Sequence, residues 1–195
     1  MFYMRSAGIL MPITALPSPW GIGTLGMSAR AFLDFLVESG QTYWQLLPIG
    51  PTGYGDSPYQ PFSSYAGNPY FIDLDDLAKM ELLLPEEYQN LDWSPSPVCV
   101  DYGLLYQSRF QVLKRAVARL WAREEKSVQS FCEKEKDWLD DYALFMSLKD
   151  HFNGKPWQDW PDDLRRRKTE ALEQARKQSE GDIQFWKGVQ FLFFE

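Results

Sequence analysis

Residues that build metal centres and disulfide frameworks are scarce in this sequence. Its 195 residues include two cysteines, Cys99 and Cys132, and one histidine, His151. The cysteines lack metal-ligand spacing and make no disulfide framework, and His151 has no acidic or cysteine partner at motif spacing. We therefore expect no metal site. The low cysteine content favours a reducing compartment, so we expect a cytoplasmic protein.

Long apolar runs and a surplus of positive charge are missing as well. No stretch approaches the ~20 consecutive apolar residues that cross a bilayer. Pro12 interrupts the apolar run that follows Arg5, so we interpret that run as a first strand and not as a signal peptide. The formal net charge is −7, and the basic cluster at residues 165–168 stands among acidic residues, as on a solvated helix face. The sequence predicts neither a membrane nor a nucleic-acid partner.

The first fifty residues alternate between strand and helix patterns. Residues 7–13 and 43–49 are short apolar runs that are typical of buried parallel strands. Residues 28–40 lie between them and end in a glycine, as a helix does. The apolar side chains of this helix are expected on one face and are Phe32, Leu33, Leu36 and Val37. Strand, helix and strand predict a βαβ unit, which belongs to parallel sheets and barrels, so the fold class is α/β.

After residue 100 the sequence becomes mainly helical. One amphipathic stripe steps by four, three, four and three residues through Tyr106, Phe110, Leu113, Val117 and Leu120. Residues 136–152 and 160–178 predict a second and a third helix. Residues 181–195 carry bulky apolar side chains around most of a helix and predict a buried one. Because no glycine stop or polar tail follows it, we expect an N-terminal fragment, cut inside or just before a core element.

Residues 50–71, GPTGYGDSPYQPFSSYAGNPYF, hold four prolines, four glycines and six aromatic residues. This segment directly follows the second predicted strand, where α/β folds bind ligands. A structural interpretation is a rigid turn, with Phe62 and Phe71 in the core. A phosphate loop is excluded because the lysine-containing pattern is absent, Pro51 lacks an N–H donor and Asp56 would repel an anion.

A carbohydrate surface is the third interpretation of this segment. Flat aromatic rings cover the C–H face of a sugar, and polar side chains hydrogen-bond its hydroxyl groups. Glycine and proline hold the backbone in turns that keep such rings displayed. The residues of the required types are Tyr54, Asp56, Ser57, Tyr59, Gln60 and Asn68.

Four segments together closely resemble the 4-α-glucanotransferases, also called amylomaltases or disproportionating enzymes. They are GILMPITALPSPWGIGTLG, YWQLLPIGPTGYGDSPYQPFSSYAGNPYFIDLDDL, VDYGLLY and WLDDYALFMSLK. The resemblance runs from about Ser6 to the end of the chain, and GPTGYGDSPYQ followed by GNPY is its most specific part. It implies a (β/α)8 TIM barrel with a mainly helical insertion, of which this chain holds the start.

The implied reaction is the transfer of α-1,4-glucan segments between maltodextrins by a retaining mechanism, with glucose as a further acceptor and no cofactor. The resemblance divides the chain into three parts. Residues 1–80 are the first βα units of the barrel with the glucan-binding loop. Residues 81–180 are a mainly helical insertion subdomain, and residues 181–195 are the start of a truncated, buried barrel helix.

By the same resemblance, Tyr54 and Tyr102 match aromatic residues of a second glucan-binding groove. Ser57 and Tyr59 match the loop that lines the active-site cleft, with Asp56 as an acceptor for a hydroxyl or a backbone N–H. Structural alternatives stay open. Asp56 can tie the turn, and Tyr102 can staple the helix that begins beside it. For Asp101 we expect only a helix cap.

Retaining chemistry needs two carboxyl groups about 5–5.5 Å apart. The adjacent acidic pairs at residues 75–76, 140–141 and 162–163 project in different directions or complement helix dipoles. No residue matches the family's catalytic acids, so we expect them beyond Glu195 and the fragment to be inactive. Two alternatives are a non-catalytic carbohydrate-binding module and an α-glucan hydrolase of the same clan. If the groove assignment is right, Tyr54→Ala weakens the handling of long glucans more than that of maltotriose.

Overall fold

The computed structural model describes residues 5–53, 55–94, 96 and 98–195. The chain divides into two compact units, Met1–Ala116 and Val117–Glu195. This boundary falls inside a long helix. The predicted division into a barrel start, a helical insertion and a barrel helix, with boundaries at residues 80 and 180, stays a prediction.

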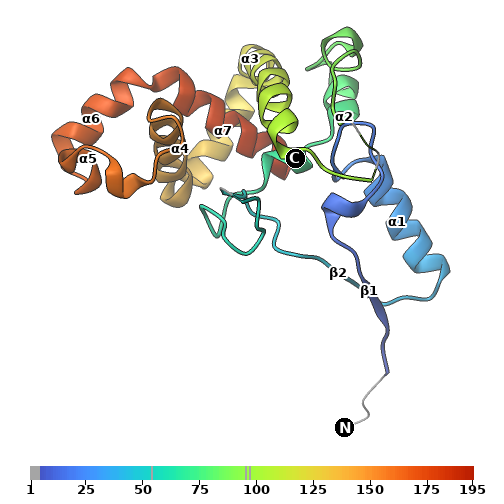
Figure 1. Cartoon of the computed structure of the whole chain (residues 1–195). Helices are drawn as coiled ribbons and strands as arrows, with labels where there is room; N and C mark the ends of the chain where they lie inside the picture. Colours follow the sequence, from blue (N-terminus) through green and yellow to red (C-terminus); the bar gives the residue numbers. More distant parts are fainter. Residues whose placement is uncertain (1–4, 54, 95, 97) are drawn as a thin grey trace. The chain divides into compact units, whose positions relative to one another are not determined.

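The first unit begins with the predicted βαβ arrangement (Figure 1). Strand β1 (Gly8–Leu10) pairs in parallel with β2 (Tyr43–Gln45), and helix α1 (Met27–Glu38) lies between them in the sequence. Gly8 stands opposite Tyr43, and a Cβ at Gly8 would come within 2.5 Å of the Tyr43 carbonyl oxygen. Glycine is therefore what lets the two strands approach at this point.

The strands are shorter and more exposed than the sequence predicts. Each has three residues, and a proline, which has no N–H for a ladder, follows within three positions of each strand at Pro12 and Pro48. Leu10 and Tyr43 are 54% and 62% exposed, so the prediction of strands buried on both faces is wrong for this chain. Parallel strands become buried when other strands flank them and helices cover both faces. Among the described residues each strand has one neighbour.

Helix α1 also departs from its predicted burial. Leu36 is buried, and the Phe32 ring packs against Trp44 of β2 with centroids 4.9 Å apart. Leu33 and Val37, predicted on the same apolar face, are 48% and 76% exposed. The helix therefore contacts the described part of the chain along one narrow edge of its apolar side.

Two side chains near the end of the 50–71 segment cap the helical turns that begin there. Asn68 is buried, and its side-chain oxygen accepts the backbone N–H of Tyr70 at 3.0 Å, which caps the 3-10 turn Pro69–Phe71. Asp73 then caps helix α2 (Leu74–Lys79) by accepting the N–H groups of Asp75 and Asp76 at 3.0 and 3.1 Å. Both caps satisfy donors at helix starts that would otherwise lack partners.

Helix α3 (Tyr102–Lys134) has 33 residues and a kink at Glu124. The Asp101 carboxylate accepts the backbone N–H of Leu104 at 2.9 Å, which confirms the predicted cap. Leu113 is buried as the stripe predicts, whereas Tyr106 is 61% exposed. The side chains buried in the first half of α3 include Leu105, Arg109, Val112, Leu113 and Ala116.

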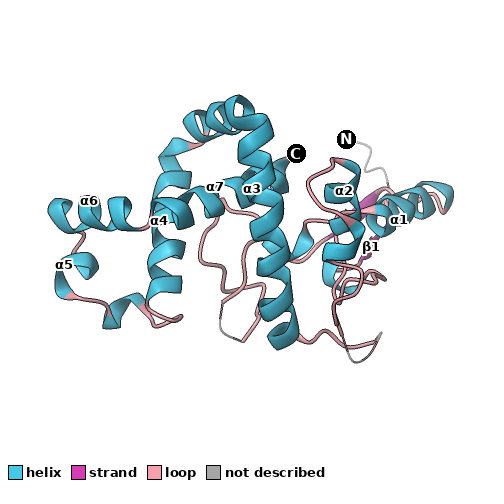
Figure 2. Cartoon of the chain, turned by 90° about the horizontal axis from the view of Figure 1, so that it is seen from above, coloured by secondary structure: helices cyan, strands magenta, loops and turns pink. Residues whose placement is uncertain are grey.

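The second unit is helical. Helix α4 (Lys136–His151) packs along helix α7 (Glu180–Phe194), and Figure 2 shows the two side by side. The predicted helix over residues 160–178 is instead two helices, α5 (Asp162–Arg165) and α6 (Thr169–Gln178). The break falls at Arg167, whose φ of +54° no right-handed helix accommodates.

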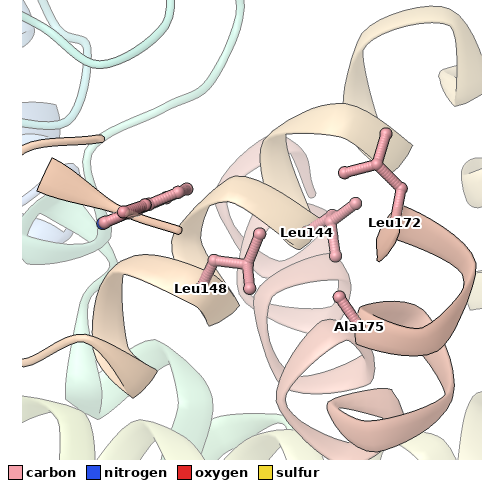
Figure 3. Packing of buried hydrophobic residues seen from close by; sticks show 5 residues of the cluster. Leu144, Leu148, Leu172 and Ala175 are labelled. Carbon is pink, nitrogen blue, oxygen red and sulfur yellow. The ribbon is translucent and has the colours of Figure 1, made fainter. Parts of the chain in front are cut away.

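The unit encloses its own apolar core. Leu144 and Leu148 of α4 meet Leu172 and Ala175 of α6 (Figure 3), and Trp160 completes the cluster. Trp186 and Val189 of α7 are buried, which confirms the prediction that residues 181–195 form a buried helix.

Candidate functional site

The segment after β2 is held in tight turns. The backbone N–H of Asp56 donates to the Gly53 carbonyl at 3.0 Å, and the N–H of Gln60 donates to the Ser57 carbonyl at 3.2 Å. Gly55 and Asp56 both have positive φ values, +88° and +53°. Glycine adopts this conformation freely, and aspartate is among the residues that tolerate it best. The turn thereby fixes where the Asp56 side chain projects.

The Asp56 carboxylate is half-buried, and burial raises its pKa. Its negative charge also acts on two phenols. The pKa of Tyr102 is raised first by burial and then by the charge of Asp56, and the same two causes raise the pKa of Tyr70. Among the described residues no donor reaches the carboxylate oxygens of Asp56, so they can accept hydrogen bonds from a ligand.

Four aromatic side chains form a cluster beside this carboxylate, which we call the aromatic cluster: Tyr70, Tyr102, Tyr106 and Phe110. The Tyr70 ring lies edge-on to Tyr102 and Phe110, with centroids 5.9 and 5.8 Å apart. The Tyr106 and Phe110 centroids are 5.4 Å apart. Tyr70 is buried and Tyr102 half-buried. The cluster thus has a buried base and a partly exposed top, and Asp56 supplies a polar group next to it.

Arg109 anchors the buried base of the cluster. Its Nη2 donates to the Tyr70 carbonyl at 2.9 Å and to the Ile72 carbonyl, and its guanidinium carbon lies 5.8 Å from the centroid of the Trp93 ring. The side chain is completely buried, and burial lowers its pKa to about 10. One cation therefore ties α3 to the backbone that follows the turn segment.

The role of Arg109 is not among the features that the sequence predicts. The available signal was a basic residue four positions after Leu105 and four before Leu113, in the middle of an apolar face. Long charged residues are almost never fully buried unless they are paired. A cation at such a position therefore predicts a specific acceptor, here two backbone carbonyls.

Two of the five predicted site residues, Asp56 and Tyr102, are close enough for the charge of Asp56 to raise the pKa of Tyr102. The Ser57 hydroxyl accepts the backbone N–H of Tyr59 at 3.3 Å, which stabilises the turn, and the Tyr59 ring is 69% exposed. No described contact joins Ser57 or Tyr59 to the aromatic cluster. Tyr54 lies outside the described residues.

Acidic pairs elsewhere are engaged in structural contacts. Asp75 accepts the indole N–H of Trp20 at 3.0 Å and the hydroxyl of Tyr88 at 2.8 Å. Asp141 pairs with Arg167 at 2.7 Å. Within the described ranges, no group of three or more His, Cys, Asp or Glu side chains is arranged to hold a metal ion, and no helix is long and apolar enough to cross a bilayer.

Known proteins resemble the chain along nearly its whole length. The family described as 4-alpha-glucanotransferase matches residues 11–195. A 4-alpha-glucanotransferase of Thermus thermophilus is 46% identical over 195 residues, covering 97% of this chain and 38% of the relative. One of Clostridium butyricum is 45% identical over 184 residues, covering 94% and 38%.

A solved structure agrees with these relatives. Amylomaltase from Streptococcus agalactiae, in complex with acarbose, is 41% identical and matches with a TM-score of 0.94, over 98% of this chain and 39% of its own. The chain therefore spans 38% of the length of the two curated relatives.

Proposed function

The chain belongs to the 4-alpha-glucanotransferase family, and we propose that it is the N-terminal part of such an enzyme and holds the glucan during transfer. The reaction is retaining transfer of α-1,4-glucan segments between maltodextrins, with glucose as a further acceptor and without a cofactor. The enzyme works in the cytoplasm, an assignment supported by the two cysteines, which are both free.

The observation that carries this proposal is the aromatic cluster with the Asp56 carboxylate beside it. The half-exposed Tyr102 ring offers a flat surface to the C–H face of a glucose unit, and Asp56 accepts a hydrogen bond from a hydroxyl group. Backbone hydrogen bonds from Asp56 to Gly53 and from Gln60 to Ser57 hold the turn, so less backbone freedom is lost on binding. The acarbose bound in the S. agalactiae amylomaltase supports a sugar-like ligand.

Ser57 and Tyr59 extend this surface along the turn segment. The exposed Tyr59 ring and the Ser57 hydroxyl lie three and one residues after Asp56. In this arrangement Tyr54 and Tyr102 hold the distant part of a long glucan, and Ser57 and Tyr59 line the cleft in which the bond is cleaved. Short substrates use the cleft alone.

The barrel and the catalytic carboxyl groups complete the proposal. β1 and β2 are the first strands of a (β/α)8 barrel, in which further strands and helices cover the exposed side chains of Leu10 and Val37. Retaining transfer needs a nucleophile and an acid about 5–5.5 Å apart. Both come from the rest of the enzyme, and the 195 residues alone transfer no glucan.

The test compares Tyr102→Ala with Tyr102→Phe in a full-length enzyme that contains this chain. Loss of the ring is expected to raise KM for long amylose about fivefold and to leave KM for maltotriose within about twofold, because one stacked ring contributes about 1 kcal/mol. Tyr102→Phe keeps the ring and most of the affinity. Trp157→Ala, which removes another half-exposed ring, is the control.

Equal losses on both substrates would remove Tyr102 from the long-glucan surface. Transfer products formed from maltotriose by the 195-residue chain would contradict the assignment of the catalytic carboxyl groups.

A further inference from the structure

The helical unit contains a groove between its helices. Its volume is about 930 Å³, and helices α3, α4, α6 and α7 supply its walls. None of its lining residues belongs to the turn segment or the aromatic cluster. The groove is therefore a separate surface of the molecule.

Trp121 gives the groove a flat, oriented aromatic wall. Its indole N–H donates to the Gln184 carbonyl of α7 at 3.0 Å. A Cβ at Gly188, one turn further along α7, would come within 3.2 Å of the same indole nitrogen. The ring is thus held against α7 and stays partly exposed. Ile183 adds an apolar side chain to the lining.

The charges around the groove cancel. Four acidic and four basic side chains line it, and several are already paired. Lys187 pairs with Asp140, and Lys136 pairs with Glu133 at 2.5 Å. An anion or a cation therefore gains no net attraction here. Ion pairs at the protein surface are weak, so the hydroxyl groups of a neutral ligand can form hydrogen bonds with the same charged side chains.

An amide adds a neutral hydrogen-bonding edge. Gln129 donates to Glu125 at 2.9 Å on the exposed side of α3, which leaves its amide oxygen as an acceptor. A flat ring, neutral amides and balanced charges suit a neutral polyhydroxylated ligand with one apolar face.

We propose that this groove binds a maltooligosaccharide and is a second carbohydrate site, independent of the aromatic cluster. The choice of an α-1,4-linked sugar rests on the proposed function of the chain. The groove takes no part in catalysis. It holds glucan at the helical unit and raises the local concentration of substrate.

Cys132 reports on the occupancy of this groove. Its half-buried thiol lines the wall, and burial raises its pKa. Cys99 is exposed, lies in the other unit and serves as an internal reference. The experiment measures iodoacetamide alkylation of both thiols at pH 8.5 by mass spectrometry, with and without maltoheptaose, while calorimetry on the same sample measures binding.

Saturating maltoheptaose is expected to slow alkylation of Cys132 at least threefold and to leave Cys99 unchanged. Tyr102→Ala, outside the groove, should retain the protection. Trp121→Ala should remove it, and so should Gln129→Trp, which adds a bulky ring to the groove lining and changes neither partner of the Trp121–Gln184 hydrogen bond.

Two outcomes overturn the proposal: binding without protection of Cys132, and protection that Tyr102→Ala abolishes. A third outcome, no binding of maltoheptaose at all, counts against the glucan-holding function and against the groove together. Because calorimetry detects any binding and alkylation reports only on the groove, the failures of the two proposals are distinguishable.

Discussion

The two units of the chain handle their apolar side chains in opposite ways. In the second unit Leu139 and Val189 are completely buried, because paired helices turn their apolar faces toward one another. In the first unit Leu10 is 54% and Val37 76% exposed, although both stand on elements of a βαβ arrangement. A parallel sheet buries its apolar side chains only when it has several strands and helices cover both of its faces. A few helices, in contrast, suffice to enclose an apolar core.

The candidate site lies in the unit with the open sheet. Asp56 lies in a turn that its backbone hydrogen bond to Gly53 closes. The Tyr102 ring packs against Tyr70, whose carbonyl accepts a hydrogen bond from the buried Arg109. The first unit therefore has two parts that should differ in stability: a strand pair with exposed sides, and a firmly bonded region around the aromatic cluster. Substitutions in the helical core, the aromatic cluster and helix α1 test this contrast.

The largest effect is expected in the helical core. Leu144→Ala removes a side chain that is 3% exposed and leaves a cavity, so we expect a loss of about 2–5 kcal/mol in the free energy of unfolding. Leu33→Ala, on the 48% exposed side of α1, should cost about 0.5 kcal/mol or less. Urea denaturation followed by circular dichroism measures both. Similar losses for the two variants would break the contrast between the units.

The next effect concerns the support of the aromatic cluster. Arg109→Met keeps the length of the side chain but leaves the carbonyl oxygens of Tyr70 and Ile72 without their donor. We expect a loss of about 1–3 kcal/mol in the free energy of unfolding, measured in urea. Arg109→Lys, which keeps one charged donor, should recover part of it. If Arg109→Met is as stable as the wild type, the cluster does not depend on this cation.

A smaller effect is expected at the start of α3. Asp101→Ala removes the side-chain acceptor for the Leu104 N–H, and the loss of such a cap costs about 1 kcal/mol. Asp101→Asn keeps an oxygen acceptor and should lie close to the wild type in thermal melts. Equal melting temperatures for Asp101→Ala and Asp101→Asn would show that the cap is not needed.

The smallest effect appears only at alkaline pH. Burial, together with the hydrogen bond to Asp75, raises the pKa of Tyr88 to about 12, above the value near 10 of an unfolded chain. The folded state therefore prefers the protonated phenol, and this stabilisation is complete below pH 10 and is lost as the pH rises toward 12. Tyr88→Phe should be less stable than the wild type at pH 8, and the gap should narrow by pH 11. A gap that stays constant or widens contradicts this.

The sequence predicted those features that depend on local pattern. The parallel pairing of β1 and β2, the helix Lys136–His151, the buried helix Glu180–Phe194 and the Asp101 cap all follow from apolar spacing and capping residues. Of the site residues, Tyr102 belongs to the aromatic cluster and Asp56 acts on it through its charge. Their role in binding glucan stays a prediction.

The features that were missed depend on contacts between distant residues. Arg109 is buried because two carbonyls about forty positions away accept its hydrogen bonds. The spacing of apolar residues does not predict such distant partners. The break at Arg167 needs a positive φ, which an arginine does not signal. The exposure of α1 depends on how many strands flank the sheet, which no local pattern specifies.

The most direct test of the account asks where a bound glucan rests. Hydrogen–deuterium exchange of the chain, with and without maltoheptaose, reports on each backbone segment separately. The account predicts slower exchange at residues 55–65 and 101–110 when the sugar binds, with residues 144–148 in the α4 core unchanged. Binding that leaves both of the first two segments unchanged would contradict it.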